Sequence, residues 1–587
     1  MSPTHAEIKV KLRELAKSER FQKDVQTLSK EEQVENLYNL MTEVGEIAQV
    51  KADDIINDLG KVFAVMESPC LIFQYGLGTL LGTHYNLGMG TIMQLIGDNR
   101  EQLQDYIDDL ENFRYWGIFM ATELDCGSNA MSMQTEAHFD VNTQEFIINT
   151  PSLGACKFMP YLSSKHQPKM AIVMARLWLS GQDCGIHPFI VHCRDRNGQL
   201  LPGVYASKAA TIDMYRVCEV DHSITAFKNV RIPHKGFLGG ALNRVTRDGK
   251  FVTKAKNKRD IFFQSFCRVE SGKMVLIAAL MPMFKLAISV AIEYSKKRRI
   301  MTKGGTESLT KVLSHKLDLA KAYISLTGSI CLYEKMKRIC LSEKLPQEKH
   351  QYCNETVKTM CVEVAREALQ ICLARTGAQG KLIRNRIVTA ILANDKASTA
   401  EGDNLPVMLK IAKDLLFNDY QPLSCNDNDI TLPITHKQRL LFLLHTQEKI
   451  AKRVLREKLM ESGNPADAWI HSTQLARHLA WAHGMCEMAD SLKHRSDIQD
   501  TFCMLHILKE GSWFIINSLV TKDELETLAS VSEKNLSTIF DQQAVHVAKE
   551  YDIVDILALT PIGNKNTAKA WCDISDFNFT PIPSSKL

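Results

Sequence analysis

The 587-residue sequence lacks a Cys-x-x-Cys pair, an apolar leader segment and a strong excess of charge of one sign. Its sixteen cysteines are scattered, which is typical of reduced, buried thiols rather than of a disulfide framework. The opening MSPTHAEIKVKLREL carries no apolar run, so we expect no secretion signal. A formal charge of +4 is close to neutral for a chain of this length and does not indicate a strongly basic surface. We therefore predict no nucleic-acid partner.

Only one apolar run approaches the length of a membrane span, 274-MVLIAALMPMFKLAISVAI-292. Pro282 and Lys285 interrupt it near its middle, where a charge is costly in lipid. This pattern favours a buried core helix, and we predict no membrane span.

Several motifs of common chemistry are also missing. The sequence contains no GxSxG, P-loop or GxGxxG motif. No motif therefore supports a serine hydrolase, a nucleotide-hydrolysing enzyme or a Rossmann-type dinucleotide-binding protein. His471, His478 and His483 share one stretch, but they have no HExxH pattern and no carboxylate pair in ligand register. We expect core or surface histidines there and predict no metal site.

Hydrophobic periodicity divides the chain into segments. Helical spacing dominates residues 1–115, whereas residues 116–240 alternate short β-branched and aromatic runs with turn residues. Long helical periods return over residues 255–417 and again over 435–570, and 571–587 read as a tail. A chain of this length needs more than one core. We therefore predict a mainly α protein with a central β domain.

A carboxylate stands out in 397-KASTAEGDNLPVMLKIAKDLL-417. Glu401 follows a run of small residues and precedes an amphipathic helix. It has two interpretations. An acidic residue at a helix start complements the helix dipole. Alternatively, a carboxylate in an apolar pocket has a raised pKa and acts as a general base on a weakly acidic proton.

A family resemblance joins these observations. The block 119-FMATELDCGSNAMSMQTEAHFDVNTQEFIINTPSLGACKFMP-160, the 233-PHKGFLGG-240 segment and the Glu-Gly before a late helix resemble peroxisomal acyl-CoA oxidases. The final Ser585, Lys586 and Leu587 match a peroxisomal address. The resemblance runs from about residue 70 to 587. It implies an acyl-CoA dehydrogenase/oxidase-like fold: an α domain, a β-barrel domain, an α bundle and an extra C-terminal α domain.

The resemblance also implies a reaction. Family members use FAD to convert a fatty acyl-CoA to the trans-2-enoyl-CoA and pass the electrons to O2, which gives hydrogen peroxide. Glu401 matches the base that removes the α-proton. Gly380 stands at the family's spacing from it, Gly402 follows it, and we expect both glycines at the substrate. The family further implies a homodimer, located in the peroxisome through the import receptor that reads the C-terminal tripeptide.

The cofactor residues also come from the resemblance. This sequence has counterparts of four features of the family's FAD site. They are a threonine that contacts the flavin, the loop that follows it, a flavin-contacting glycine that is a tyrosine here, and an arginine that binds the FAD pyrophosphate. A capped turn and a solvated basic cluster are the alternatives for the loop and the arginine. The residues assigned in this way are Thr122, Glu123, Gly127, Ser128, Tyr161 and Arg298.

Other departures from the family pattern keep a second function open. Ile300 replaces a glutamine, residues 311–314 replace Gln-Gln-Tyr-Lys, and Ala400 replaces an aromatic residue before the base. The chain is therefore either an FAD-dependent oxidase or a catalytically impaired, acyl-CoA-binding paralogue. An acyl-CoA dehydrogenase is disfavoured by the C-terminal tripeptide and the extra helical section.

Overall fold

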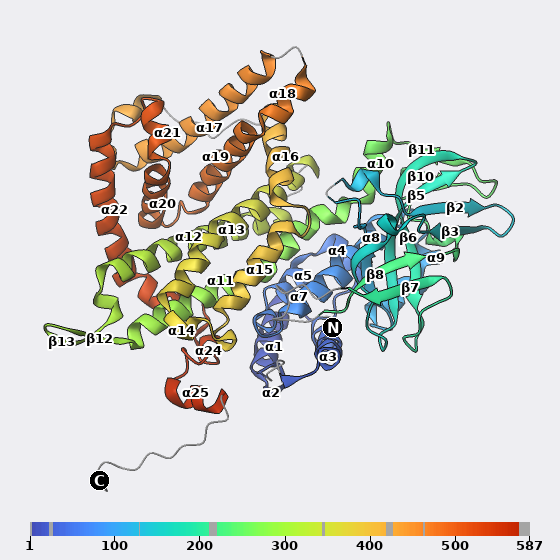
Figure 1. Ribbon diagram of the computed structural model, residues 1–587, viewed down its shortest axis with the longest axis horizontal. Coiled ribbons are helices and arrows are strands. Elements are labelled where there is room, and N and C mark those ends of the chain that lie inside the picture. Colours follow the sequence, from blue (N-terminus) through green and yellow to red (C-terminus); the bar gives the residue numbers. More distant parts are fainter. Residues whose placement is uncertain are drawn as a thin grey trace, which may run out of the picture. The chain divides into compact units, whose positions relative to one another are not determined.

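The computed structural model describes residues 3–22, 27–127, 129–209, 220–342, 347–417, 427–461 and 464–574. Ser128 and the predicted targeting tripeptide Ser585, Lys586 and Leu587 lie outside these residues. The chain forms two compact units (Figure 1). The first comprises Met1–Ala279, Lys337–Lys358 and Thr399–Asp403, and the second comprises Leu280–Met336, Thr359–Ser398 and Asn404–Leu587.

Helices open the first unit, as the sequence predicts. Capping boxes start two of them, because Thr4 and Ser29 each accept from a backbone N–H while Glu7 and Glu32 bond back to the cap. The helices are α1 (His5–Lys17), α2 (Glu19–Gln22), α3 (Lys30–Ala48), α4 (Ala52–Asn57), α5 (Gly60–Met66), α6 (Cys70–Phe73), α7 (Tyr75–Gly82), the π-helix η2 (Thr83–Met89), α8 (Gly90–Gln94) and α9 (Arg100–Glu111).

The glycine-rich stretch around η2 packs directly against the sheet. A Cβ on Gly88 would lie 3.2 Å from the Gly117 Cα, so the two backbones touch. The Gly117 N–H also donates to His84 Nδ1 at 3.0 Å. Single π-turns occur often at functional sites because they displace one residue from the helical register. Here the π-helix carries Asn86, which faces the site described below.

The central β domain follows and contains a curled sheet of six strands. Its order is β1-β5-β2-β3-β9, with β6 paired to the other edge of β5. A three-stranded sheet has the order β4-β8-β7, and β10 pairs with β11. The strands are β1 (Trp116–Met120), β2 (Glu136–Asp140), β3 (Glu145–Asn149), β4 (Lys157–Tyr161), β5 (Lys169–Leu179), β6 (Gln182–Arg194), β7 (Val204–Lys208), β8 (His222–Phe227), β9 (Val230–Pro233), β10 (Asn243–Val245) and β11 (Phe251–Thr253).

A buried polar cluster fastens α3 to the sheet. Lys169 of β5 donates to Asp221 at 3.1 Å and also bonds to Tyr38 of α3, whose hydroxyl donates to Asp221 at 2.6 Å. All three side chains are almost fully buried. Removing one partner of such a buried pair leaves an uncompensated charge, so the cluster fixes where α3 meets the sheet.

Helix α11 (Cys267–Lys297) runs from the first unit into the second and follows α10 (Lys258–Ser265). It contains the apolar segment 274–292, and 89% of its most apolar window is buried in protein. This burial agrees with the predicted core helix. Pro282 lies inside the helix without ending it.

The second unit is a helical assembly with one small hairpin, β12 (Arg299–Thr302) and β13 (Gly305–Ser308). Its helices, three of which (α12, α13 and α15) also contribute residues to the first unit, are α12 (Leu313–Ser342), α13 (Gln347–Arg375), α14 (Gly377–Gly380), α15 (Ile387–Thr399), α16 (Asn404–Phe417), α17 (Lys437–Met460), α18 (Pro465–His471), α19 (Thr473–Ser491), α20 (Ser496–Lys509), α21 (Gly511–Ile516), α22 (Lys522–Gln542), α23 (Val547–Glu550), α24 (Val554–Leu557) and α25 (Thr567–Ile574).

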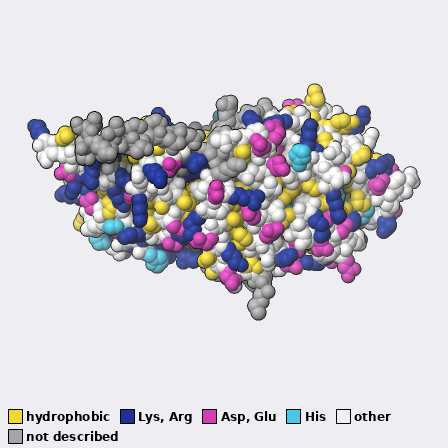
Figure 2. Space-filling view, turned by 90° about the horizontal axis from the view of Figure 1, so that it is seen from below, with side chains coloured by type: hydrophobic (Ala, Val, Ile, Leu, Met, Phe, Trp, Pro, Cys, Tyr) yellow, Lys and Arg dark blue, Asp and Glu magenta, His cyan; other side chains and the backbone are white. Residues whose placement is uncertain are grey.

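The surface agrees with the nearly neutral charge of the chain. On the face drawn in Figure 2, basic and acidic side chains of the described residues are interspersed rather than gathered by sign.

Candidate active site

Glu401 lies in a tight turn between α15 and α16. The sequence was expected to place it where a loop meets a helix, but the small residues before it are helical up to Thr399. Glu401 has φ +55° and Gly402 has φ +99°. A left-handed conformation at a non-glycine residue costs of order 1–3 kcal/mol and persists where the surroundings fix it. Lys358 contributes here, because its Nζ donates to the Gly402 carbonyl at 2.5 Å.

The Glu401 carboxyl group rests against the backbone of α11 at Gly272. A Cβ on Gly272 would lie 2.5 Å from Glu401 Oε1 and 2.9 Å from Asn86 Nδ2. The missing side chain at Gly272 therefore makes the room that the carboxyl group occupies. All three residues belong to the first unit.

Burial dominates the electrostatics of Glu401. Its side chain keeps a small exposed area, but protein surrounds the carboxyl group and raises its pKa to about 7. Lys273 opposes this rise, Glu270 adds to it, and the more weakly acting Lys358 and Arg268 oppose it. Loss of water around the charged form thus outweighs three nearby cations. The result is a carboxyl group that exchanges its proton near neutral pH.

Arg268 and Asn86 form a buried clamp beside this carboxyl group. Arg268 donates to the Asn86 side-chain oxygen at 2.6 Å, and Asn86 Nδ2 donates to the Arg268 carbonyl at 2.9 Å. Ser271 also donates to Asn86 at 3.1 Å. Burial lowers the pKa of Arg268 to about 10, so the guanidinium stays charged at neutral pH. The clamp ties η2 to the start of α11, where Glu401 packs.

The predicted flavin loop follows β1, and its members differ in exposure. Thr122 and Gly127 are exposed, and Gly127 has φ +52°. Glu123 is buried. It accepts from the Thr135 N–H at 2.9 Å and the Thr135 hydroxyl at 2.5 Å, and from Lys157 at 3.0 Å. The Glu123 carboxylate is therefore engaged in holding the loop together.

Tyr161 ends β4, at an irregularity of that strand. The pairing of β4 with β8 shifts register between Phe158 and Tyr161, and Met159 has φ +68°. The Tyr161 ring packs against the core of the β domain and lies 5.0 Å from the His222 ring. The side chain that replaces the family's glycine is thus turned toward its own domain. Bulges of this kind re-aim residues next to active sites.

The loop and β4 are joined by hydrogen bonds. Phe158 N–H donates to the Thr122 carbonyl at 3.0 Å, and Glu123 pairs with Lys157 as an antiparallel bridge. The structure therefore brings the predicted Thr122, Glu123 and Gly127 loop next to the strand that carries Tyr161.

Two predicted residues lie in the second unit. Arg298 is exposed and directly follows α11. Gly380 is buried at the end of α14, where a Cβ would lie 1.8 Å from the Thr376 hydroxyl. Close packing within its own unit therefore accounts for Gly380, whose predicted place at the substrate stays a prediction.

Sequence reasoning missed the residues that surround Glu401. Asn86, Arg268, Gly272 and Lys358 come from η2, α11 and α13, and nothing in their local patterns relates them to residue 401. Their role becomes visible only when the fold brings these segments together.

Comparison with known proteins bears on both fold and family. No family model matches the chain. A curated relative, acyl-coenzyme A oxidase 2, peroxisomal, from Arabidopsis thaliana is 30% identical over 377 residues, which cover 62% of this chain and 53% of the relative. The match therefore spans about half the length of that relative.

Solved structures match over almost the whole chain. Acyl-CoA oxidase3 from Yarrowia lipolytica has a TM-score of 0.82 at 19% identity, over 99% of this chain and 90% of that one. Acyl-CoA oxidase-2 of Caenorhabditis elegans, solved with FAD, ascaroside-CoA and ATP, has a TM-score of 0.79 at 17% identity, over 99% and 92%. These matches confirm the predicted acyl-CoA dehydrogenase/oxidase-like fold.

Proposed function

We propose that this chain, which is similar in sequence and in fold to acyl-CoA oxidases, oxidises fatty acyl-CoA thioesters with FAD and O2. The products are the trans-2-enoyl-CoA and hydrogen peroxide. One observation carries the proposal: a carboxyl group with a pKa of about 7, held in a constrained turn at Glu401. A base is most effective when its pKa lies near the working pH.

The role of Glu401 is to take the α-proton of the thioester. Its ionised carboxylate accepts that proton on one oxygen while the electron pair of the C–H bond becomes the new α,β double bond. Gly402 supports this step, because its left-handed conformation keeps the turn tight. The Arg268–Asn86 clamp and Gly272 set where the carboxyl group lies.

Several residues of this chain suit FAD. Thr122 and Gly127 are exposed residues of one loop, and Arg298 is an exposed arginine whose guanidinium suits a pyrophosphate. Tyr161 leaves its backbone to face a ligand because its ring packs inward. The chemistry that bound FAD supplies is uptake of the β-hydride and transfer of two electrons to dioxygen.

The proposed location comes from the relatives. The Arabidopsis relative is named peroxisomal. We place the oxidation in peroxisomes. The homodimer expected from the family stays a prediction.

A second candidate is an acyl-CoA-binding protein without turnover. Ile300 and residues 311–314 favour it, since they depart from the residues that the resemblance leads us to expect at the cofactor. The colour of the purified protein distinguishes the two candidate functions, because a bound flavin absorbs visible light.

To test the proposal, the full chain is purified with added FAD and assayed under air with acyl-CoA thioesters of increasing length. We expect a yellow protein with about one flavin per chain, and equal amounts of peroxide and enoyl-CoA from at least one thioester. A folded, colourless protein that releases no peroxide would contradict the proposal and favour the binding protein.

Gly272→Ala tests the position of the base. The new Cβ would lie 2.5 Å from Glu401 Oε1, at the far end of a flexible side chain, and 2.9 Å from Asn86 Nδ2 of the clamp, so both side chains must shift. We expect kcat to fall about tenfold to a hundredfold, as misplaced catalytic groups do. Gly82→Ala is the matched control, because its Cβ makes only ordinary contacts at 3.6 Å or more. Equal kcat for both variants would remove Gly272 from this role.

A further inference from the structure

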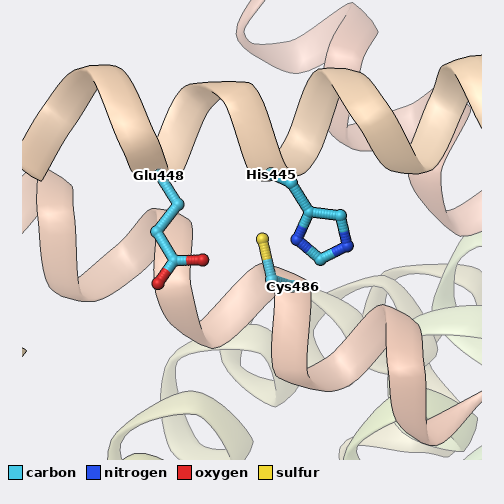
Figure 3. Close-up of side chains that lie close together, drawn as sticks. All are labelled: His445, Glu448 and Cys486. Carbon is cyan, nitrogen blue, oxygen red and sulfur yellow. The ribbon is translucent and has the colours of Figure 1, made fainter. Parts of the chain in front are cut away.

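A cluster in the second unit is independent of the site around Glu401. His445 and Glu448 lie one helical turn apart on α17, and Cys486 faces them from α19. Their ligand atoms all lie within 4.8 Å of one another. Figure 3 shows the three side chains pointing toward a common point between the two helices.

The cluster is dry. His445 is 7% exposed, Glu448 2% and Cys486 3%. Within the part of the chain that the structure describes, the Nδ1 atom of His445 is buried and has no hydrogen-bond partner. A buried imidazole nitrogen without a partner costs free energy, so such a group calls for an explanation. A metal ion supplies one, since a neutral imidazole nitrogen is a metal ligand.

The donor set selects the kind of metal. Imidazole, thiolate and carboxylate together suit Zn²⁺, whereas Ca²⁺ and Mg²⁺ take oxygen ligands. With the thiol deprotonated, one thiolate, one carboxylate and one Zn²⁺ sum to zero charge. A buried site with no net charge avoids the cost of an uncompensated ion.

The spacing also suits a helical bundle. Ligands in such sites come from residues three apart on facing helices. His445 and Glu448 form one such pair, and His483 and Cys486 form another on α19. Ligands of a tetrahedral Zn²⁺ stand roughly 3.3–3.8 Å apart. Closing the cluster from its present separations therefore needs side-chain shifts of about 1 Å.

A neighbouring histidine positions the carboxylate. His483 is fully buried, and its Nδ1 lies 2.8 Å from Glu448 Oε1. This contact orients Glu448 and leaves its second oxygen for a metal. Partners of this kind around a ligand are a regular part of zinc sites.

We propose that His445, Glu448 and Cys486 form a binding site for one Zn²⁺ ion, with His483 positioning the carboxylate. The ion joins α17 to α19 and so stabilises the helical second unit. The sequence alone predicts no metal here, because neither helix carries a complete ligand set.

The test uses the full chain prepared without metal and then loaded with Zn²⁺ or Co²⁺. We expect about one Zn²⁺ per chain after dialysis, a thiolate-to-cobalt charge-transfer band, and a higher thermal midpoint with Zn²⁺ than without. Cys486→Ser removes the band and the metal-dependent rise. His445→Gln is a second variant and lowers Zn²⁺ affinity at least tenfold.

Cys372→Ser is the matched control, since it removes a buried thiol of the same unit outside the cluster. It should keep the metal, the band and the rise in thermal midpoint. Thermal unfolding without metal shows whether each variant folds. Well below one Zn²⁺ per parent chain, or a cobalt band that is the same in Cys486→Ser, would overturn the proposal and indicate adventitious metal only.

Discussion

Replacing Glu401 with glutamine should lower the rate of acyl-CoA oxidation by about 10²–10⁴-fold, the usual contribution of a positioned general base. Glutamine keeps the size and hydrogen-bonding capacity of glutamate but cannot accept the α-proton. Flavin content should be unchanged, because the residues expected at FAD lie elsewhere. The measurement is peroxide and enoyl-CoA released per bound flavin, at saturating acyl-CoA under air.

The pH profile sharpens this prediction. Glu401 acts as a base only when ionised, and burial raises its pKa to about 7. In the parent, kcat/KM should therefore rise as pH increases through about 7 and then level off. In Glu401→Gln the residual rate should lose this dependence.

Asp403→Asn is the matched control for Glu401→Gln, because it neutralises an exposed carboxylate two residues away. It should keep the parent rate and profile. An oxidation rate in Glu401→Gln equal to that of the parent would show that another group removes the proton. Loss of flavin from Glu401→Gln would instead point to a role in cofactor binding, and the rate per bound flavin separates the two.

The order of elements could be predicted because hydrophobic periodicity changes along the chain. Spacing of three and four residues gave way to short alternating runs near residue 116, and β1 begins there. Residues 255–417 were predicted to be helical as a whole, but the small residues directly before Glu401 were expected to form a loop rather than the end of α15. Residues 387–399 are rich in alanine and small polar residues, so they lack a strongly apolar stripe that would have marked α15.

The sequence singled out only one residue of the site around Glu401, namely Glu401 itself. A carboxylate before an amphipathic helix is a local pattern with two interpretations, and the family resemblance favoured the base. The burial of Glu401 could not be predicted, since it depends on Asn86, Arg268 and Gly272, which lie more than 120 residues away in the sequence. Contacts of that separation follow from packing and leave no periodic signal in one sequence.

The cluster on α17 and α19 shows the same limit in another form. His483 was read as one of three histidines on a single stretch, where it had no carboxylate in ligand register. Its partner Glu448 lies on a different helix. The pair on α17 and the pair on α19 form one cluster of possible metal ligands only when the two helices pack against each other.

The raised pKa of Glu401 also predicts how stability depends on pH. The carboxyl group has a pKa of about 7 in the folded protein, against an ordinary glutamate pKa of 4.5. As pH rises past 4.5 the unfolded chain releases this proton while the folded chain retains it, so the free energy of unfolding falls. The loss is complete near pH 7. A difference of this size corresponds to about 3 kcal/mol.

Glu401→Gln removes this pH dependence because glutamine does not ionise. We therefore expect the variant and the parent to have equal stability near pH 4.5, and the variant to be more stable by about 3 kcal/mol at pH 8. Urea unfolding at both values measures the difference, with hydrogen exchange of α11 reporting on the site. Asp403→Asn, with its exposed carboxylate, should show no such gain. A variant-minus-parent difference that stays constant from pH 5 to 8 would mean that Glu401 is ionised throughout, and a carboxylate already ionised at pH 5 is too weak a base for the proposed step.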